Sequence, residues 1–95
     1  MPAFIVATVT IHDPARFAEY GKLVAVLSER FGGESVMKGA VSDALEGDVT
    51  IGERVVVTRF ADADAARAYI ASPEYQAARA TRGDAATVTM RLIAL

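Results

Sequence analysis

Five side chains in this sequence have chemistry suited to binding or transforming a small molecule. They are two tyrosines at helical spacing, an arginine near a helix end, a glutamate in a glycine turn and the single histidine: Tyr20, Tyr75, Arg82, Glu46 and His12. The planar guanidinium of Arg82 can clamp a carboxylate or a phosphate. Each tyrosine can present its hydroxyl to a pocket between helices and sheet. We therefore predict that Arg82, Tyr75 and Tyr20 bind a ligand.

Catalytic chemistry has weaker support, and each candidate also has a structural explanation. Glu46 would act as a general acid or base only in a buried setting, and turn acids are usually solvated. His12 would need an orienting partner, but its neighbour Asp13 is the expected cap of a helix. A buried tyrosine commonly bonds to a backbone or carboxylate group, and Arg82 could instead pair with a nearby acid. Glu46 and His12 are thus weak catalytic candidates.

Composition argues against several other kinds of site. The chain has no cysteine and one histidine, so thiolate nucleophiles, disulfides and histidine metal clusters are not available, and we expect no metal and no cofactor. Its formal net charge is −2, without the basic patch that nucleic-acid binding needs. The apolar N-terminal stretch lacks a basic flank and a cleavage site, so we expect no membrane span and a cytoplasmic protein of bacterial type.

The side chains above must be positioned by strands and helices that the sequence marks clearly. β-Branched residues predict strands over 4–11 and 54–60, and alternation predicts a third over 86–95. The weaker stretch 34–45 predicts an edge strand with a bulge or bend at Gly39.

Cap signals predict three helices between these strands. An aspartate or serine, twice followed by proline, precedes each helical pattern, and glycine ends two of them. The expected helices span 14–30, 63–71 and 73–82. The order of elements predicts an α+β fold, the ferredoxin-like βαββαβ arrangement, in which helices cover one face of a four-stranded antiparallel sheet. Residues 1–95 are expected to form a single domain.

The first strand is apolar on both faces, although the helices can cover only one. We therefore predict that a second copy of the chain covers the other face, giving a homodimer through the sheet. The residues expected on that face are Phe4, Val6, Val56 or Val57, Phe60 and Ile93.

Several motifs resemble the family called domain of unknown function 1330. They are Tyr69-Ile70-Ala71-Ser72-Pro73-Glu74-Tyr75-Gln76-Ala77, Asp13-Pro14 followed by Phe17 and Tyr20, Gly32-Gly33, and Leu45-Glu46-Gly47 ahead of a strand that ends at Phe60. The resemblance implies a ferredoxin-like fold of the dimeric α/β-barrel superfamily and implies no established activity. It also implies that Arg82 matches a favoured arginine, and that Lys38-Gly39 stands where the family often has arginine and glycine. Lys38 thereby becomes a further ligand-binding candidate.

These observations predict a small-molecule-binding protein that holds an acidic or polar metabolite between its sheet and its helices. One alternative is a cofactor-independent enzyme, an isomerase or a monooxygenase. Monooxygenases of the superfamily that the fold resembles tend to rely on asparagine, tryptophan and histidine together, and this chain has neither of the first two. The other alternative is a non-catalytic dimeric structural module.

Overall fold

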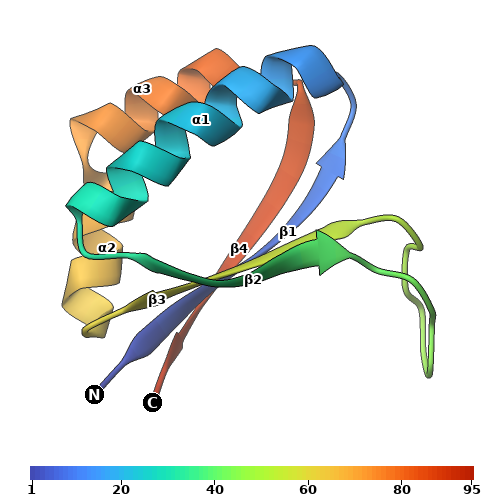
Figure 1. Cartoon of the computed structure of the whole chain (residues 1–95), viewed down its shortest axis with the longest axis horizontal. Helices are drawn as coiled ribbons and strands as arrows, with labels where there is room; N and C mark the ends of the chain where they lie inside the picture. Colours follow the sequence, from blue (N-terminus) through green and yellow to red (C-terminus); the bar gives the residue numbers. More distant parts are fainter.

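The computed structural model describes the whole chain, residues 1–95. Its elements in order are β1 (Ala3–Ile11), α1 (Pro14–Arg30), β2 (Glu34–Ala40), β3 (Arg54–Phe60), α2 (Ala63–Ala71), α3 (Pro73–Arg82) and β4 (Ala86–Ala94). The strands form one antiparallel sheet in the order β2-β3-β1-β4. The helices lie on one side of this sheet (Figure 1). The predicted ferredoxin-like fold is confirmed.

Local capping sets where each helix begins. The side chains of Asp13, Asp62 and Ser72 each accept a hydrogen bond from the amide three residues further on, at 3.2, 2.7 and 3.1 Å. These bonds satisfy backbone donors that the first turn of a helix leaves free. Gly32, with a φ of +84°, follows the end of α1 in a conformation that favours glycine. The three predicted helices are confirmed.

Strand pairing decides which side chains face the helices. Ile5, Ala7 and Val9 of β1 are buried on the helix side. Phe60 pairs with Ala3, so it lies on the same side and is 1% exposed. Its predicted place on the opposite face was therefore wrong.

The other face of the sheet, here called the outer sheet face, is largely apolar. Register places six apolar side chains on it: Phe4, Val6, Met37, Val55, Val57 and Ile93. Val57, which pairs with Val6, is the outward valine of the two considered above. Met37 and Ile93 are 54% and 46% exposed, because no element of the chain covers this face.

The main core lies between the helices and the sheet and is rich in aromatic rings. Tyr69 of α2 is at its centre, with ring centroids 5.7 Å from Phe60, 5.8 Å from Phe31 and 5.2 Å from Tyr75. Such offset and edge contacts add to the free energy gained by burial. This cluster fixes α2 and α3 on the sheet, while α1 packs mainly on α3.

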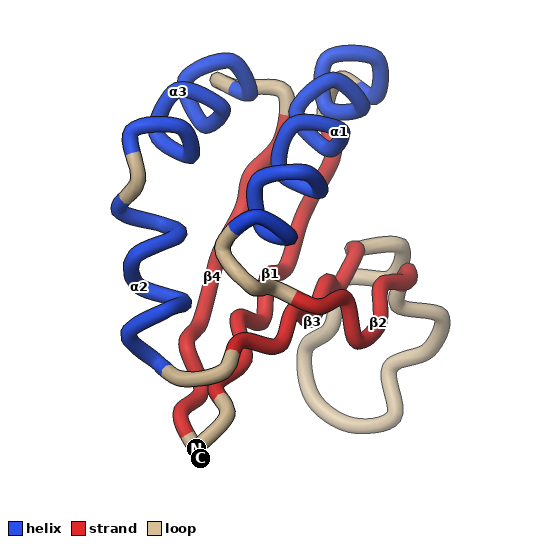
Figure 2. Tube along the Cα trace, turned by 60° about the vertical axis from the view of Figure 1, so that its left-hand side comes forward, coloured by secondary structure: helices blue, strands red, loops and turns tan.

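Residues 41–53 form a projecting loop, here called the arm. The predicted edge strand extended to residue 45, but β2 ends at Ala40, and its register shift lies between Ser35 and Met37 and not at Gly39. Val41 closes the base of the arm through backbone hydrogen bonds with Glu53 and Gly52. Beyond this base the arm extends to the side of the sheet away from the helices (Figures 1 and 2).

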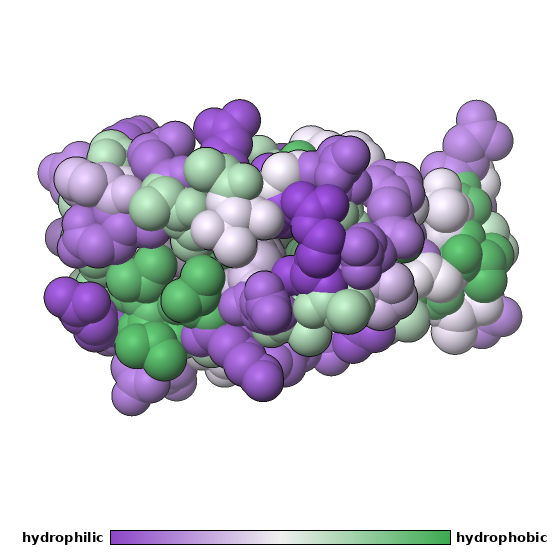
Figure 3. Space-filling view, turned by 90° about the horizontal axis from the view of Figure 1, so that it is seen from above, coloured by the Kyte–Doolittle hydropathy of each residue, from purple (hydrophilic) through white to green (hydrophobic).

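Apolar side chains are also exposed on the helix side. Leu23 and Val26 lie on the solvent side of α1, and Figure 3, which looks down on the helices, shows apolar atoms gathered near one end of this face. A second apolar group appears at the far end of the view, where the arm projects. None of the helices is both long enough and apolar enough to cross a membrane.

Candidate functional site

A cavity lies between α1 and the sheet. Its volume is about 720 Å³, which falls within the range of roughly 300–1,000 Å³ that is typical of small-molecule sites. The floor is formed by side chains of β1 and β3, and the roof by one face of α1. Because no helix covers β2, the cavity opens over that edge of the sheet.

Small residues explain why this space is not filled. Ala7 lies in the middle of the floor, and Ala18, Gly21 and Ala25 lie along the roof. A Cβ atom added to Gly21 would have no neighbour within 4 Å. Larger residues at these positions would close the gap between helix and sheet, since protein interiors normally pack without such voids. The cavity is therefore specified by side-chain size in α1 and β1.

A buried polar cluster stands behind one wall of the cavity. Arg82 donates through Nη1 to the Tyr20 hydroxyl at 3.3 Å, and the hydroxyls of Tyr20 and Tyr75 are 3.1 Å apart. The Tyr75 hydroxyl donates to Sδ of Met90 at 3.9 Å. Each tyrosine hydroxyl can both donate and accept, so either one can be the donor in the pair. The chain of hydrogen bonds thus runs from Arg82 through both tyrosines to Met90.

This setting keeps the tyrosines protonated. Burial raises the pKa of Tyr20, and the hydrogen bond and proximity of Tyr75 raise it further, against a smaller opposing effect of Arg82. Burial likewise raises the pKa of Tyr69, which also lines the cavity. Both residues therefore present neutral hydroxyl groups at neutral pH. The guanidinium of Arg82 also lies over the Tyr20 ring, 5.1 Å from its centroid, and its buried Nε has no partner.

The mouth of the cavity carries charged side chains that are exposed to solvent. Lys38 of β2 and Arg54 of β3 lie at one part of the mouth, and Glu29 near the end of α1 lies at another. Glu34 at the start of β2 also borders the cavity, but it pairs with Arg59 on the other face of the sheet. The interior between these two parts of the mouth is lined mainly by aliphatic and aromatic groups. The cavity thus combines an apolar interior with charged groups at its opening.

The structure brings together part of the predicted set of ligand-binding residues. Tyr20 and Lys38 both line the cavity. Tyr75 and Arg82 contact Tyr20 from behind the wall and do not line the cavity themselves. The roles of all four in binding stay predictions, but Arg82 is placed to position Tyr20 more than to meet a ligand.

The two weak catalytic candidates lie elsewhere. Glu46 is in the arm, away from the cavity. His12 follows β1, and its Nε2 is 2.8 Å from Oγ1 of Thr87, outside the set of residues that line the cavity. A catalytic role for either residue would therefore have to operate at another place than this cavity.

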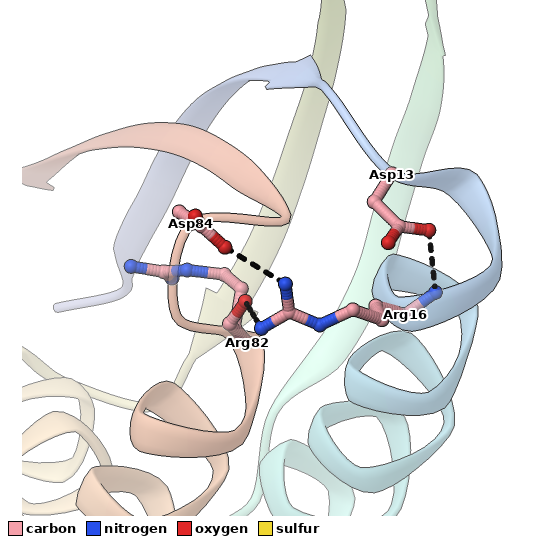
Figure 4. A network of polar contacts seen from close by, with 4 residues as sticks. All are labelled: Asp13, Arg16, Arg82 and Asp84. Carbon is pink, nitrogen blue, oxygen red and sulfur yellow. Dashed lines mark hydrogen bonds and ion pairs between the residues drawn. The ribbon is translucent and has the colours of Figure 1, made fainter.

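A surface network joins the start of α1 to the end of α3. Arg16 donates to the Asp84 carboxylate at 2.7 Å and to the backbone carbonyl of Arg82 at 3.4 Å, while the Arg82 side chain points away from it (Figure 4). The hydrogen bond from Arg16 lowers the pKa of the exposed Asp84 carboxyl. Asp84 thus pairs with Arg16, and Arg82 stays free to contact Tyr20.

Sequence reasoning missed Arg54 as a residue of the site. Arg54 was noted only as the start of a strand, but the period-two pattern of that strand places it on the same face as Val56 and Thr58. All three line the cavity. A positive charge in register with the buried face of a strand was the signal available in the sequence.

The chemistry available in the cavity is recognition by shape, by neutral hydroxyls and by charges at the mouth. The protein has no group of three or more histidine, cysteine, aspartate or glutamate side chains placed to hold a metal ion.

Comparison with known sequences identifies the family. The family described as domain of unknown function DUF1330 matches residues 2–95. This chain belongs to the DUF1330 family. The family resemblance inferred from the motifs around Ser72-Pro73 is thereby confirmed, and the DUF1330 match covers nearly the whole chain. No curated protein matches the sequence.

Solved structures share the fold of this DUF1330 chain at low sequence identity. A protein of unknown function from Rhodopseudomonas palustris has a TM-score of 0.79 at 21% identity, over 99% of this chain and 82% of that one. SnoaB, a cofactor-independent oxygenase from Streptomyces nogalater, gives 0.71 at 21% over 99% and 92%. A dimeric ferredoxin-like protein of unknown function from Thermobifida fusca gives 0.67 at 20% over 100% and 92%. At these identities the comparison supports the fold alone.

Proposed function

We propose that this DUF1330 protein binds a small molecule in the cavity between α1 and the sheet. The observation that carries the proposal is a cavity of about 720 Å³ with an apolar interior and a few polar groups, kept open by small residues. Folding gains free energy by filling such space, so a void of this size costs stability unless something occupies it. Ligand binding would account for the small residues Gly21 and Ala7 in its lining.

A pair of variants at Gly21 tests this proposal. Gly21→Leu would place a large side chain into the roof of the cavity, whereas Gly21→Ala adds one methyl group at the same helical site. In a thermal-shift screen of acidic and polar metabolites, ligands that raise the Tm of the wild type should also raise that of Gly21→Ala. They should have no effect on Gly21→Leu. Equal shifts in all three proteins would locate binding outside the cavity.

Two copies of the chain are proposed to form a homodimer through the outer sheet face. Support comes from the six apolar side chains on that face and from the related fold described as dimeric. Burying a large apolar side chain is worth about 1.5–3 kcal/mol, so face-to-face pairing would offset the cost of exposing this surface. Sedimentation at micromolar concentration would give the mass of two chains.

A cofactor-independent oxygenase is the second candidate function, supported by the fold shared with SnoaB. Tyr20 lines the cavity, and Arg82 and Tyr75 fix its hydroxyl, so it is the residue proposed to contact an aromatic substrate. Oxygen uptake in the presence of electron-rich phenolic compounds, lost in Tyr20→Phe, would establish this activity. Ligand binding without oxygen uptake would support the first proposal.

A further inference from the structure

We propose that the ligand is an amphiphilic anion whose acidic group is held by Lys38 and Arg54 at the mouth, while its apolar body lies beneath α1. This inference rests on the proposed function, and it identifies the chemical class of the ligand and its orientation. Four features of the cavity support it: the pairing of the two cations, their lack of ion pairs, the separation of charge at the mouth and the apolar interior.

Strand register places the two cations together. Lys38 pairs with Val56, and Arg54 pairs with Ala40, which lies two residues beyond Lys38 on the same strand. Lys38 and Arg54 are therefore diagonal neighbours on the face of the sheet that looks toward α1. Side chains in this relation are about 7–8 Å apart at their bases. Their long, flexible stems can bring both charged ends to one acidic group.

Neither cation has its charge neutralised by the chain. The ion pairs of the protein are Arg16 with Asp84 and Arg67 with Asp64, and neither includes Lys38 or Arg54. Two neighbouring like charges repel each other, and an anion between them removes this repulsion. Arginine offers two parallel donors to a carboxylate, and lysine adds a compact charge.

The acid at the mouth lies apart from these cations. Glu29 is in the last turn of α1, whereas Glu34 pairs with Arg59 and by register belongs to the outer sheet face. The mouth therefore has a basic end near the base of the arm and an acidic end near the C-terminus of α1. An anionic ligand is attracted to the first and repelled from the second, which orients it in the cavity.

The interior requires the rest of the ligand to be apolar. Between the basic end and the back wall the lining includes Val9, Phe17, Val24, Val56 and Val88. Arg82 does not line the cavity, so it offers no second binding point for a charge at depth. A ligand with one acidic group and a hydrocarbon or aromatic body matches this distribution.

Three probes that share one chain length test the inference: decanoate, 1-decanol and decylammonium. Measured by isothermal titration calorimetry, the affinity of the wild type should be highest for decanoate, lower for decanol and lowest for decylammonium. For Lys38→Ala or Arg54→Ala, decanoate affinity should fall about threefold, and for the double variant about tenfold, as expected for exposed charge pairs. Decanol affinity should not change. Arg59→Ala removes a cation from the outer sheet face and serves as the matched control, with no loss for any probe.

The outcomes separate this inference from the proposed function. The inference is wrong, although the cavity still binds ligands, in either of two cases. In the first, the wild type has the same affinity for decanoate as for decanol and the double variant loses no decanoate affinity. In the second, decylammonium binds with the highest affinity. If no probe binds, the inference is wrong, and the metabolite screen with the Gly21 variants decides the proposed function. If Gly21→Leu binds all three probes as well as the wild type does, binding lies outside the cavity and both proposals are wrong. A decanoate affinity that falls with added salt, with decanol unaffected, would support the inference a second time.

Discussion

Tyr20 is the residue at which the packing of the helices meets the wall of the cavity. Its ring packs 5.6 Å from that of Phe17, its hydroxyl bonds to Tyr75 and Arg82, and one side of it lines the cavity. Removing the hydroxyl would leave Nη1 of Arg82 and the hydroxyl of Tyr75 without this partner, a loss that costs more than the bond itself contributes. The residue that supports the fold here also shapes the site.

Alkaline pH is expected to destabilise the protein through its tyrosines. Burial raises the pKa of both Tyr20 and Tyr69 above the ordinary value of 10.0. Above about pH 10 the unfolded chain therefore holds fewer protons than the folded protein, and the free energy of unfolding falls as pH rises. Below that pH this contribution is fully present. Guanidinium unfolding at pH 8, 9.5 and 11, followed by circular dichroism, would measure the decline.

Absorbance at 295 nm provides the control for this prediction. The tyrosinate signal of Tyr20 and Tyr69 should appear together with unfolding and not before it. Tyr20→Phe should weaken the pH dependence. A free energy of unfolding that stays constant to pH 11 would contradict the expected shift.

Gly33 is required by close packing and not by its backbone conformation. A Cβ atom there would lie 2.8 Å from the backbone oxygen of Ser28 and 2.9 Å from the Phe60 ring. We expect Gly33→Ala to lower the free energy of unfolding by about 1–3 kcal/mol, the usual cost of overpacking. Gly39→Ala is the matched control, since nothing lies within 4 Å of its added methyl group. If urea unfolding gives both variants the same free energy of unfolding, the core can rearrange to accommodate the methyl group at residue 33.

At the scale of elements, Ser72 joins two helices. Its hydroxyl donates to the Tyr69 carbonyl at the end of α2, at 2.7 Å, and accepts from the Tyr75 amide at the start of α3. Ser72→Ala would leave both backbone groups without this partner in a buried position. We expect a loss of about 1–2 kcal/mol in denaturant unfolding. Ser42→Ala in the exposed arm should change stability by no more than about 0.5 kcal/mol.

The elements that the sequence predicts well are those with local signals. Asp13-Pro14 and Ser72-Pro73 determine helix starts through bonds that span three residues, so a reader of the sequence can find them. The end of β2 and the face of Phe60 depend on pairing between strands far apart in the chain. Register of that kind is not encoded in any short window, which is why both predictions were wrong.

Less of the candidate site could be predicted. The chemistry of Tyr20 was recognisable from its type and helical spacing, and Lys38 was found through a family resemblance. The cavity itself results from a gap between α1 and the sheet, which depends on the combined size of residues such as Ala7 and Gly21 on different elements. Arg54 became visible as a cavity residue only when β3 was paired with β1 and β2.

At the scale of the whole molecule, the exposed apolar side chains of the outer sheet face predict a homodimer formed through that face. Val57 pairs with Val6 near the middle of that face. Val57→Glu would bury a charge in a dimer formed there, so we expect it to yield monomers in sedimentation at concentrations where the wild type is dimeric. Val26→Glu, on the exposed side of α1, is the control and should leave the dimer intact. Dimers of Val57→Glu as stable as the wild type would contradict an interface on this face.

The arm has a consequence for how two such chains would separate. It carries four acids, Asp43, Glu46, Asp48 and Glu53, with no basic residue over 41–53, and its Leu45 is 96% exposed. It reaches toward the side of the sheet on which Arg59 and Arg91 lie. In a two-fold pair each arm would clasp the neighbouring chain, so that mixing of labelled subunits would be slow, and replacing residues 42–52 with a short glycine turn would make subunit exchange fast.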